Sequence, residues 1–394
     1  MVLYGGPSGS QASLREANSV RVVDAIQRYG RITQVELAAV TGLSSATISN
    51  IVKQLVERGV VATENTIRSG RRAQLVHLRT QSALAVGVHI AKRALRIEIA
   101  DASHTVTAEK VLPLPTDHRA DTTLDRAALL ISELTDEMGV PLDEIVGIGL
   151  ALPAPIDPHT RNISVRGIMR DWEETDIRHV LERRLGRPVL VENDANAAAI
   201  GEYLYGNLRG YSDGVYIRAS YHCGAGIMLN GKLHHGPHGI AGEIGHVQVD
   251  PLGPICQCGN RGCLNTVVGA DALIDLLRVS RGHLSLRDVI TLANDGDPGC
   301  VHLISDAGTT IGQVVANLIT WLDTQRIVVG GELAETGDIL LAPLSSAIRT
   351  RPLLGYERVS VVQSALHGTA ESKGALALAL QAFSDPITAT SEVA

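Results

Sequence analysis

The 394-residue sequence predicts an α/β protein that begins with a separate, mostly helical domain. Three observations support this. From about residue 81, short apolar runs typical of strands alternate with stretches of helical periodicity, which is the pattern of sheets covered by helices. Before that point, three short helical patterns are followed by a small hairpin. At 394 residues, the chain is long enough for two or three domains.

The first helical patterns have recognisable ends. After residues 1–16, which we expect to be a flexible leader, a helix runs to about Gly30. Its expected apolar side consists of Val20, Val23, Ala25 and Ile26. A second helix opens at Thr33, where Glu36 three residues later completes a capping box, and it ends at Gly42, which suits a tight left-handed turn.

The third helix carries the candidate DNA-reading face. Its apolar residues recur at helical spacing, namely Ile48, Ile51, Val52 and Leu55. The opposite face holds short polar and basic side chains, and the candidates for DNA contact are Ser45, Thr47, Ser49, Asn50 and Lys53. Short polar side chains can approach base edges in the major groove, and a lysine suits a phosphate. A tight turn before such a helix predicts a helix-turn-helix.

A basic hairpin follows the third helix and completes the pattern of a wing. Arg71 and Arg72 at its tip suit phosphates or a narrow minor groove. Residues 1–80 carry a net charge of +5, whereas the whole chain carries −7, so the remainder is acidic at −12. We therefore expect a winged helix-turn-helix DNA-binding domain at residues 17–80. The alternatives are a helical bundle for protein contacts and ordinary scatter of surface charge.

The remainder of the chain predicts an effector domain at residues 81–383. Its expected strands are residues 83–90, 95–102, 144–152, 188–193, 214–219, 226–233 and 326–332. Its expected helices are residues 123–139, 195–206, 270–279 and 310–323. Residues 384–394 are expected to be a disordered tail. No apolar run approaches the roughly 20 residues that span a bilayer, and no export signal is evident, so we expect a cytoplasmic protein without a membrane partner.

Three of the five cysteines are clustered, which predicts a metal site. Clustered cysteines in a reducing compartment are more often metal ligands than disulfides. Cys256, Cys258 and Cys263 supply three sulfurs, and His246 is the best fourth donor for one structural zinc ion. Four protein ligands leave no position open for a catalytic water. Cys223 and Cys300 are isolated, and we expect them to be small buried hydrophobes.

Three stretches closely resemble signature sequences of the ROK family (repressors, open reading frames, kinases). They are VENDANAAAIGE at residues 191–202, HHGPHGIAGEIGHVQVD at residues 234–250 and CQCGNRGCLN at residues 256–265. The resemblance covers nearly the whole chain, because family repressors carry a winged helix-turn-helix ahead of a sugar-kinase-like domain. It implies a two-lobed, actin-like α/β fold with a sugar site between the lobes.

The resemblance also implies roles for particular residues. The zinc ligands would be His246, Cys256, Cys258 and Cys263, and the sugar contacts would be Asn193, Asp194, Glu243 and His246. Asp194 matches the general base of family kinases, although it could equally cap the helix that follows it. Family kinases usually place a glutamate where this chain has Asn265, which leaves room for a ligand other than a glucose-like sugar.

Both phosphate-binding patterns of the family kinases are altered here. His89, Ala91, Lys92 and Arg93 stand where those kinases have D-X-G-G-T, and Ser220, Tyr221 and His222 stand where they have G-T-G. Phosphoryl transfer needs backbone amides that approach the phosphates closely, so we expect no catalysis. Only the glycine pair Gly330–Gly331, which resembles the nucleotide-side turn, is kept.

The sequence therefore predicts a sugar-responsive transcriptional regulator, a repressor, with a non-catalytic sugar-binding domain. As a homodimer or homotetramer it would read a roughly palindromic operator in double-stranded DNA. One alternative is an active ATP-dependent sugar kinase with an added DNA-binding domain. Another is a zinc-stabilised protein-interaction module without a ligand.

Overall fold

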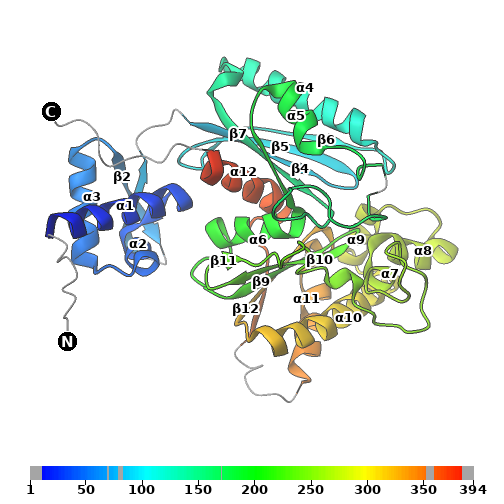
Figure 1. The fold of residues 1–394 in the computed structure, drawn as a ribbon. Helices are drawn as coiled ribbons and strands as arrows, with labels where there is room; N and C mark the ends of the chain where they lie inside the picture. Colours follow the sequence, from blue (N-terminus) through cyan, green and yellow to red (C-terminus); the bar gives the residue numbers. More distant parts are fainter. Residues whose placement is uncertain (1–10, 69–70, 79–82, 170, 352–358, 384–394) are drawn as a thin grey trace, which may run out of the picture.

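The computed structural model describes residues 11–68, 71–78, 83–169, 171–351 and 359–383. Figure 1 shows a small domain beside a larger one, and the larger domain has two lobes with a sheet in each. We call residues 11–78 the head and residues 83–383 the body. Within the described residues, no single helix is both long and apolar enough to cross a membrane; the bent pair formed by residues 34–41 and 45–57 meets that test only jointly, by length and composition.

The head is a winged helix-turn-helix. Its elements are α1 (Gln11–Tyr29), β1 (Ile32–Thr33), α2 (Gln34–Thr41), α3 (Ser45–Glu57), β2 (Val61–Arg68) and β3 (Arg71–Leu78). The strands form one antiparallel sheet in the order β1-β3-β2, and the β2–β3 hairpin is the wing. The expected capping box between Thr33 and Glu36 is confirmed, as is the left-handed Gly42 (φ 69°) that ends α2.

The structure corrects two expectations for the first helix. It begins at Gln11, so residues 11–16 are helical and do not belong to a flexible leader. Val20 is 43% exposed, whereas Val22, Ile26 and Tyr29 are buried. Residues 22, 26 and 29 form one stripe at helical spacing, and residue 20 falls on the opposite side of it. Residues 1–10 and the expected tail at residues 384–394 lie outside the described part of the chain.

The upper lobe of the body contains a five-stranded sheet in the order β6-β5-β4-β7-β8. Its strands are β4 (Leu84–Ile90), β5 (Ala94–Asp101), β6 (Val106–Pro113), β7 (Ile145–Leu152) and β8 (Val189–Asn193). Its helices are α4 (Ala120–Met138), the short 3-10 turn η1 (Leu142–Glu144) and α5 (Ile177–Leu185). All of β4 is buried, because helices cover both faces of the sheet (Figure 1).

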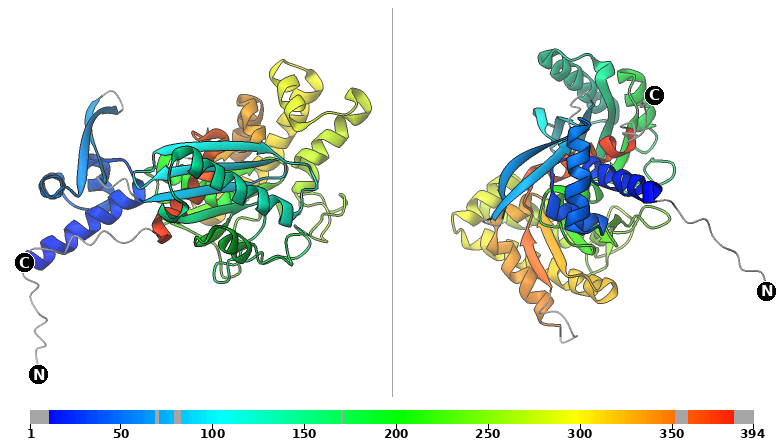
Figure 2. Two further views of the ribbon diagram at one scale, coloured as in Figure 1. Left: turned by 90° about the horizontal axis from the view of Figure 1, so that it is seen from above. Right: turned by 90° about the vertical axis from the view of Figure 1, so that its left-hand side faces the viewer.

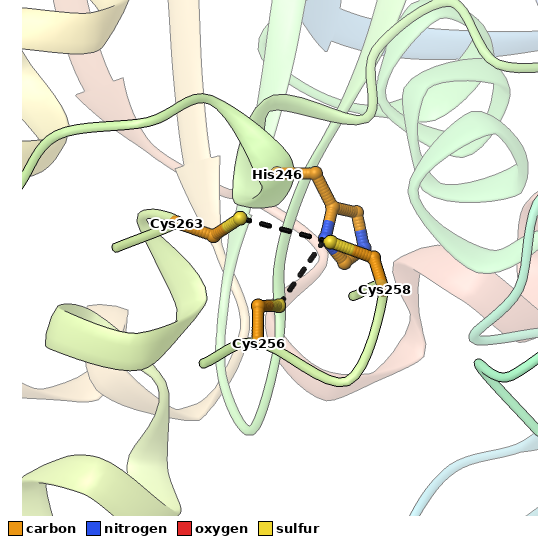
Figure 3. A group of neighbouring side chains, drawn as sticks. All are labelled: His246, Cys256, Cys258 and Cys263. Atoms are coloured by element: carbon orange, nitrogen blue, oxygen red, sulfur yellow. Dashed lines mark hydrogen bonds between the residues drawn. The ribbon is translucent and has the colours of Figure 1, made fainter. Parts of the chain in front are cut away.

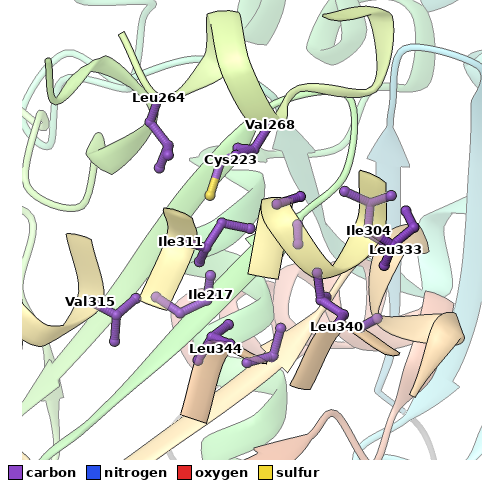
Figure 4. Close-up of a cluster of buried hydrophobic side chains, with 14 of the residues drawn as sticks. Ile217, Cys223, Leu264, Val268, Ile304, Ile311, Val315, Leu333, Leu340 and Leu344 are labelled. Atoms are coloured by element: carbon purple, nitrogen blue, oxygen red, sulfur yellow. The ribbon is translucent and has the colours of Figure 1, made fainter. Parts of the chain in front are cut away.

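The lower lobe contains the second sheet, in the order β11-β10-β9-β12-β13. Its strands are β9 (Gly214–Ala219), β10 (Cys223–Leu229), β11 (Lys232–Leu233), β12 (Arg326–Gly330) and β13 (Ser360–Gln363). Its helices are α7 (Asn265–Val268), α8 (Ala270–Arg281), α9 (Leu286–Asn294), α10 (Pro298–Leu322) and α11 (Asp338–Arg349), with 3-10 turns η2 (Ile244–His246), η3 (Glu332–Thr336) and η5 (His367–Thr369). Figure 4 shows Ile217 and Cys223 of the sheet packed against Ile311 of α10. Cys223 and Cys300 are both buried, as expected.

Two helices lie side by side between the sheets, namely α6 (Asp194–Tyr205) and α12 (Ala370–Phe383) (Figure 1). Glycine permits their close approach, because a Cβ on Gly374 would stand 1.7 Å from the carbonyl oxygen of Ala197. The sequence pattern predicts α6 but gives no sign of α12. That helix is buried on nearly every side, so it lacks the one-sided pattern on which such predictions depend.

The head and the body share one hydrophobic core. Val22 and Ile26 of α1 belong to the same buried cluster as Leu204 of α6 and Ala377 of α12. Figure 2 shows the head at one end of the body, with α1 leading into it. We call the contacts of α1 with α6, α12, the β5–β6 turn and the β10–β11 turn the head–body joint. Its polar contacts include a hydroxyl–hydroxyl distance of 3.2 Å between Tyr29 and Tyr203.

Candidate functional site

The four residues expected to contact a sugar line a single pocket between the lobes. Asn193 and Asp194 come from the junction of β8 and α6, and Glu243 and His246 come from the segment around η2. We call this space the interlobe pocket. Its volume of about 30 Å³ has room for roughly one water molecule. A sugar ring therefore requires a different arrangement of the lobes or of the side chains that line the pocket.

Asn193 caps helix α6, and both ends of its side chain are engaged. Its Oδ1 accepts a hydrogen bond from the backbone N–H of Asn196 (3.0 Å), and its Nδ2 donates to the carbonyl oxygen of Ala154 (3.0 Å). Asp194 is the first residue of the helix, and its Oδ1 accepts from the N–H of Ala195 (2.7 Å). Asn193 therefore fixes the start of the helix, while the second carboxylate oxygen of Asp194 remains for other partners.

A buried ion triad forms the wall behind Asp194. Arg218 of β9 places its Nε 3.2 Å from Asp194 Oδ2 and donates to Glu371 Oε1 of α12 at 2.9 Å. The exposed fractions of the three residues are 5%, 5% and 3% in the order Arg218, Asp194, Glu371. Burial raises the pKa of Asp194, but the charge of Arg218, the nearby His89 and the hydrogen bond from the Ala195 N–H together hold the pKa below its ordinary value. Asp194 is therefore a carboxylate at neutral pH, paired with the Arg218 guanidinium.

Sequence reasoning missed Arg218 and Glu371. A signal for Arg218 was present, since an arginine within an apolar predicted strand needs a buried partner. Glu371 is 153 residues away in a helix that the pattern did not reveal, so nothing in the sequence pairs the two.

Glu192 is a second buried carboxylate that sequence reasoning missed. It accepts hydrogen bonds from the N–H of Asn193 (2.9 Å) and from Asn196 Nδ2 (3.1 Å), and it pairs with His235 (2.9 Å) and Arg161 (3.1 Å). Burial alone would raise its pKa, yet these partners, His235 first, hold the pKa of Glu192 below its ordinary value. Glu192 therefore anchors the turn from which Asn193 and Asp194 project.

The four expected metal ligands come together in space (Figure 3). The ligand atoms of His246, Cys256, Cys258 and Cys263 all lie within 4.8 Å of one another. Cys258 Sγ lies 3.7 Å from Cys263 Sγ, and Cys256 Sγ lies 3.6 Å from His246 Nδ1. Tetrahedral zinc with Zn–S bonds of about 2.3 Å would hold sulfurs about 3.8 Å apart. The group could therefore hold a metal ion with little rearrangement.

His246 connects this cysteine group to the interlobe pocket. Its Nδ1 faces Cys256, and its Nε2 lies 4.0 Å from Glu243 Oε2 in the pocket wall. Burial raises the pKa of Glu243 to about 7, and the negative charge of Asp194 adds to the effect. One imidazole therefore faces a sulfur on one side and a pocket carboxyl on the other.

Two segments that the sequence places at the expected phosphate-binding positions, around Lys92 and around Tyr221, contact each other across the lobes. Lys92, between β4 and β5, forms an ion pair with Asp271 of α8, and its Nζ lies 5.3 Å from the ring centroid of Tyr221. Next to them lies a cavity of about 320 Å³, which is lined in part by Gly330, Gly331 and Arg218. His89 also lines it, and its Nε2 lies 3.9 Å from Asp194 Oδ2.

The candidate DNA-reading face is on the outside of α3. Its apolar stripe is buried as predicted, and four of its five candidate contacts are exposed: Ser45, Ser49, Asn50 and Lys53. Thr47 is half-buried, with its hydroxyl 2.8 Å from that of the capping residue Ser44. Arg71 and Arg72 lie at the start of β3, where Arg71 pairs with Arg68 in the hairpin register. Their side chains are outside the described part of the structure.

Comparisons with known protein families match both parts of the chain. A model of the ROK family matches residues 85–382, and a model described as "Winged helix-turn-helix DNA-binding" matches residues 15–62. The chain is 32% identical over 372 residues to the DNA-binding transcriptional dual regulator NagC of Escherichia coli, covering 91% of each chain. It is 25% identical over 384 residues to the xylose repressor of Bacillus subtilis, covering 96% of this chain and 98% of the relative.

Solved structures agree with this assignment. The crystal structure of a ROK family transcriptional regulator, a homologue of the E. coli MLC protein, matches with a TM-score of 0.71 and 24% identity over 93% of this chain and 97% of that one. A ROK family glucokinase from Streptomyces griseus, solved with glucose and AMPPNP, matches 76% of this chain and 99% of its own at 27% identity, with a TM-score of 0.67. The chain belongs to the ROK family, with a winged helix-turn-helix domain ahead of its two-lobed, actin-like ROK domain.

Proposed function

We propose that this protein is a sugar-responsive transcriptional repressor. It binds operator DNA through the winged helix and senses a sugar or sugar derivative in the interlobe pocket without phosphorylating it. Relatives with the same two-part organisation over nearly their whole length include a xylose repressor and a dual regulator, which supports the proposal. The alternative of a zinc-stabilised interaction module without a ligand accounts for neither the winged helix nor the polar pocket.

The observation that carries the proposal is the course of α6. This helix begins at Asn193 and Asp194 in the interlobe pocket and ends at Tyr203 and Tyr205 in the head–body joint. Its 12 residues make a rod of about 18 Å. Tyr203 contacts Tyr29 of the head, so a change in the arrangement of the lobes that carries α6 with it as a rigid rod also moves the surface on which the head rests.

This arrangement gives sugar binding a route to DNA affinity. A sugar can shift operator binding only by its different affinity for the two lobe arrangements, which typically corresponds to about 1–3 kcal/mol of coupling. The small volume of the interlobe pocket supports the idea that the sugar-bound arrangement differs from the one described here.

Two observations support a non-catalytic body. Asp194, which matches the general base of the family kinases, is ion-paired with Arg218 and carries a lowered pKa, so it is a weak base. Lys92 and Tyr221, which stand where the resemblance places the phosphate-binding patterns of those kinases, contact each other across the lobes. Such contacts would hold the lobes together without a nucleotide.

The metal is proposed to be one structural zinc ion per chain. Zinc prefers thiolate and imidazole ligands, and the distances among His246, Cys256, Cys258 and Cys263 suit a closed tetrahedral site. Such an ion would fix the loop that carries His246 beside Glu243. We expect Cys258→Ser to reduce the zinc content from about one ion per chain to none, as measured by metal analysis. Full retention of zinc by this variant would contradict the ligand set.

On the DNA side, we propose contacts from Ser45, Thr47, Ser49, Asn50, Lys53, Arg71 and Arg72. Helix-turn-helix proteins bind palindromic sites as dimers, so a homodimer or homotetramer in the cytoplasm is part of the proposal. Asn50→Ala should change sequence preference, whereas Arg71→Ala with Arg72→Ala should weaken binding to all sequences and flatten its salt dependence. An unchanged preference for Asn50→Ala would argue against its contact with a base.

The deciding experiment measures operator affinity by fluorescence anisotropy with and without sugars. We expect one class of sugar to change the affinity of the wild type, and Asp194→Asn to lose much of this response while sugar-free DNA binding stays nearly unchanged. The active-kinase alternative draws on the glucokinase match and on the cavity beside Gly330 and Gly331. A coupled assay with ATP, magnesium and the same sugars tests it, since turnover that disappears in Asp194→Asn would establish a kinase.

A further inference from the structure

We infer that the effector is a neutral glycoside larger than one sugar ring, and that its second ring lies in a groove beside the interlobe pocket. This inference rests on the proposed function, because it assumes that the first ring occupies the interlobe pocket. It specifies the class of ligand, which the proposed function leaves open.

The groove adjoins the pocket directly. It has a volume of about 650 Å³, within the range of about 300–1,000 Å³ typical of small-molecule sites. One wall is formed by residues 254–257, in the loop that carries the cysteine group, and another by residues at the start of α8. Three side chains line both spaces, namely His222, Gln257 and Asn265. The groove therefore continues the interlobe pocket toward solvent.

His222 stands between the two spaces. It is half-buried, and burial lowers its pKa to about 4, so the ring is neutral at physiological pH. Movement of His222, together with Gln257 and Asn265, which line both spaces, would join the pocket to the groove. A ligand that only fills the pocket gains nothing from that opening, whereas one that extends into the groove does.

The lining of the groove selects against an anionic substituent. Its charged residues are Asp271 and Asp275, and no arginine or lysine is among the side chains that line it. Lys92, at the edge, is held in its ion pair with Asp271. A phosphate would face these carboxylates without a free cation, so a sugar phosphate would not be stabilised in the groove.

A second sugar ring matches the same lining. Its hydroxyls can donate to the carboxylates of Asp271 and Asp275 and to the amide oxygen of Gln257. Its C–H face can pack on the apolar side chains there, since Ile255 is 62% exposed and Leu276 is 68% exposed. Large apolar side chains at the edge of a polar pocket are typical of a ligand site.

The test uses calorimetry on the full chain with matched pairs of sugars: glucose and cellobiose, xylose and xylobiose, N-acetylglucosamine and its β-1,4 dimer. For the pair that binds, we expect the disaccharide to bind at least about tenfold more tightly than its monosaccharide. Ala272→Trp fills the groove from α8 and should bring the two affinities within about twofold of each other. The control, Val279→Trp, puts the same side chain on α8 at a position that is 96% exposed and outside the groove, so it should keep the preference.

A second variant, Asp275→Asn, keeps the test decisive if Ala272→Trp fails to fold. Asp275→Asn removes an exposed carboxylate and should weaken disaccharide binding several-fold while leaving monosaccharide binding unchanged. A monosaccharide that binds as tightly as its disaccharide, with no effect of Ala272→Trp, would overturn this inference and leave the proposed function standing. Failure of every sugar to bind would overturn both.

Discussion

The two ends of α6 differ in what holds them. The N-terminal end lies against a buried ion triad, in which Arg218 is fixed by Asp194 and Glu371. The C-terminal end meets the head through hydroxyl and ring contacts: Tyr203 meets Tyr29, and the guanidinium of Arg28 lies 5.5 Å from the Tyr203 ring centroid. Tyr205 meets His104, which in turn contacts the Gln27 carbonyl of the head. Separating a buried ion pair leaves unpaired charges and is costly, whereas a contact between hydroxyls can be replaced by contacts with water. The helix is therefore held rigidly at the ligand end and more loosely at the head.

This difference suits a sensor. Selectivity requires that the residues around a ligand keep their geometry, whereas release of DNA requires that some contact give way at modest cost. The head–body joint is the weaker of the two regions by this reasoning. The predictions below test that ranking, beginning with the largest expected effect.

Removing the charge at the rigid end should be costly. Arg218→Met would leave the buried carboxylates of Asp194 and Glu371 without a cation, and we expect the free energy of unfolding, measured by urea denaturation, to fall by about 3–5 kcal/mol. Combining it with Asp194→Asn and Glu371→Gln removes the unpaired charges and should restore much of the loss. If the free energy of unfolding of Arg218→Met alone stayed within about 1 kcal/mol of the wild type, the triad would not be what holds this end of α6.

Acid should loosen the head end first. Burial lowers the pKa of His104 to about 4 from an ordinary 6.5, and its ring contacts the Tyr205 hydroxyl and the Gln27 carbonyl, with Asp101 as the neighbouring charge. When the joint opens, His104 regains its ordinary pKa and takes up a proton. The docked state is therefore fully stable above about pH 6.5 and loses up to about 3 kcal/mol as the pH falls toward 4.

Hydrogen exchange of α1 at pH 7.5 and pH 5 measures this loosening. His104 has a positive φ of 62°, which asparagine tolerates, so His104→Asn provides a variant without the titrating ring. We expect faster exchange in α1 at the lower pH in the wild type and little pH dependence in the variant. Equal pH dependence in both proteins would assign the effect to another group.

Removing one hydroxyl at the joint should have the smallest effect. Tyr203→Phe deletes the contact with Tyr29 and should cost about 0.5–1.5 kcal/mol of docking. We expect the ratio of operator affinities without and with sugar to change several-fold, while sugar affinity measured by calorimetry stays within about twofold. Tyr29→Phe and the double variant complete a cycle, and strictly additive effects would mean that the two hydroxyls do not act together.

The sequence predicts those features of the fold that depend only on residues close together in the chain. The stripe of Ile48, Ile51, Val52 and Leu55 and the Thr33–Glu36 capping box depend on neighbours within one helix, and both are confirmed. The cysteine group is also local, because Cys256, Cys258 and Cys263 lie within eight residues of one another. The spacing alone gives only weak support for His246 as the fourth ligand. The resemblance to the ROK family implies it independently.

Contacts between distant segments were beyond the reach of sequence reasoning. Arg218 and Glu371 are far apart in the chain, and their pairing depends on α12, which is buried on so many sides that it shows no amphipathic pattern. The start of α1 at Gln11 was missed because residues 11–16 are mostly polar, and Leu14 alone among them is a large apolar side chain, so no apolar period marks the helix. The hydrogen bond from Asn193 Nδ2 to the carbonyl of Ala154 joins two separate loops, so no local sequence pattern predicts it.

The hydrophobic core shared by head and body limits how this protein can be recombined. Ala102, Leu204 and Ala377 of the body are buried together with the side chains of the head, so removing the head would expose an apolar face to water. A chimaera that joins this body to another DNA-binding domain must therefore supply a complementary first helix as well as a linker. The head and the body are separate in architecture, but they can be exchanged only together with the surface between them.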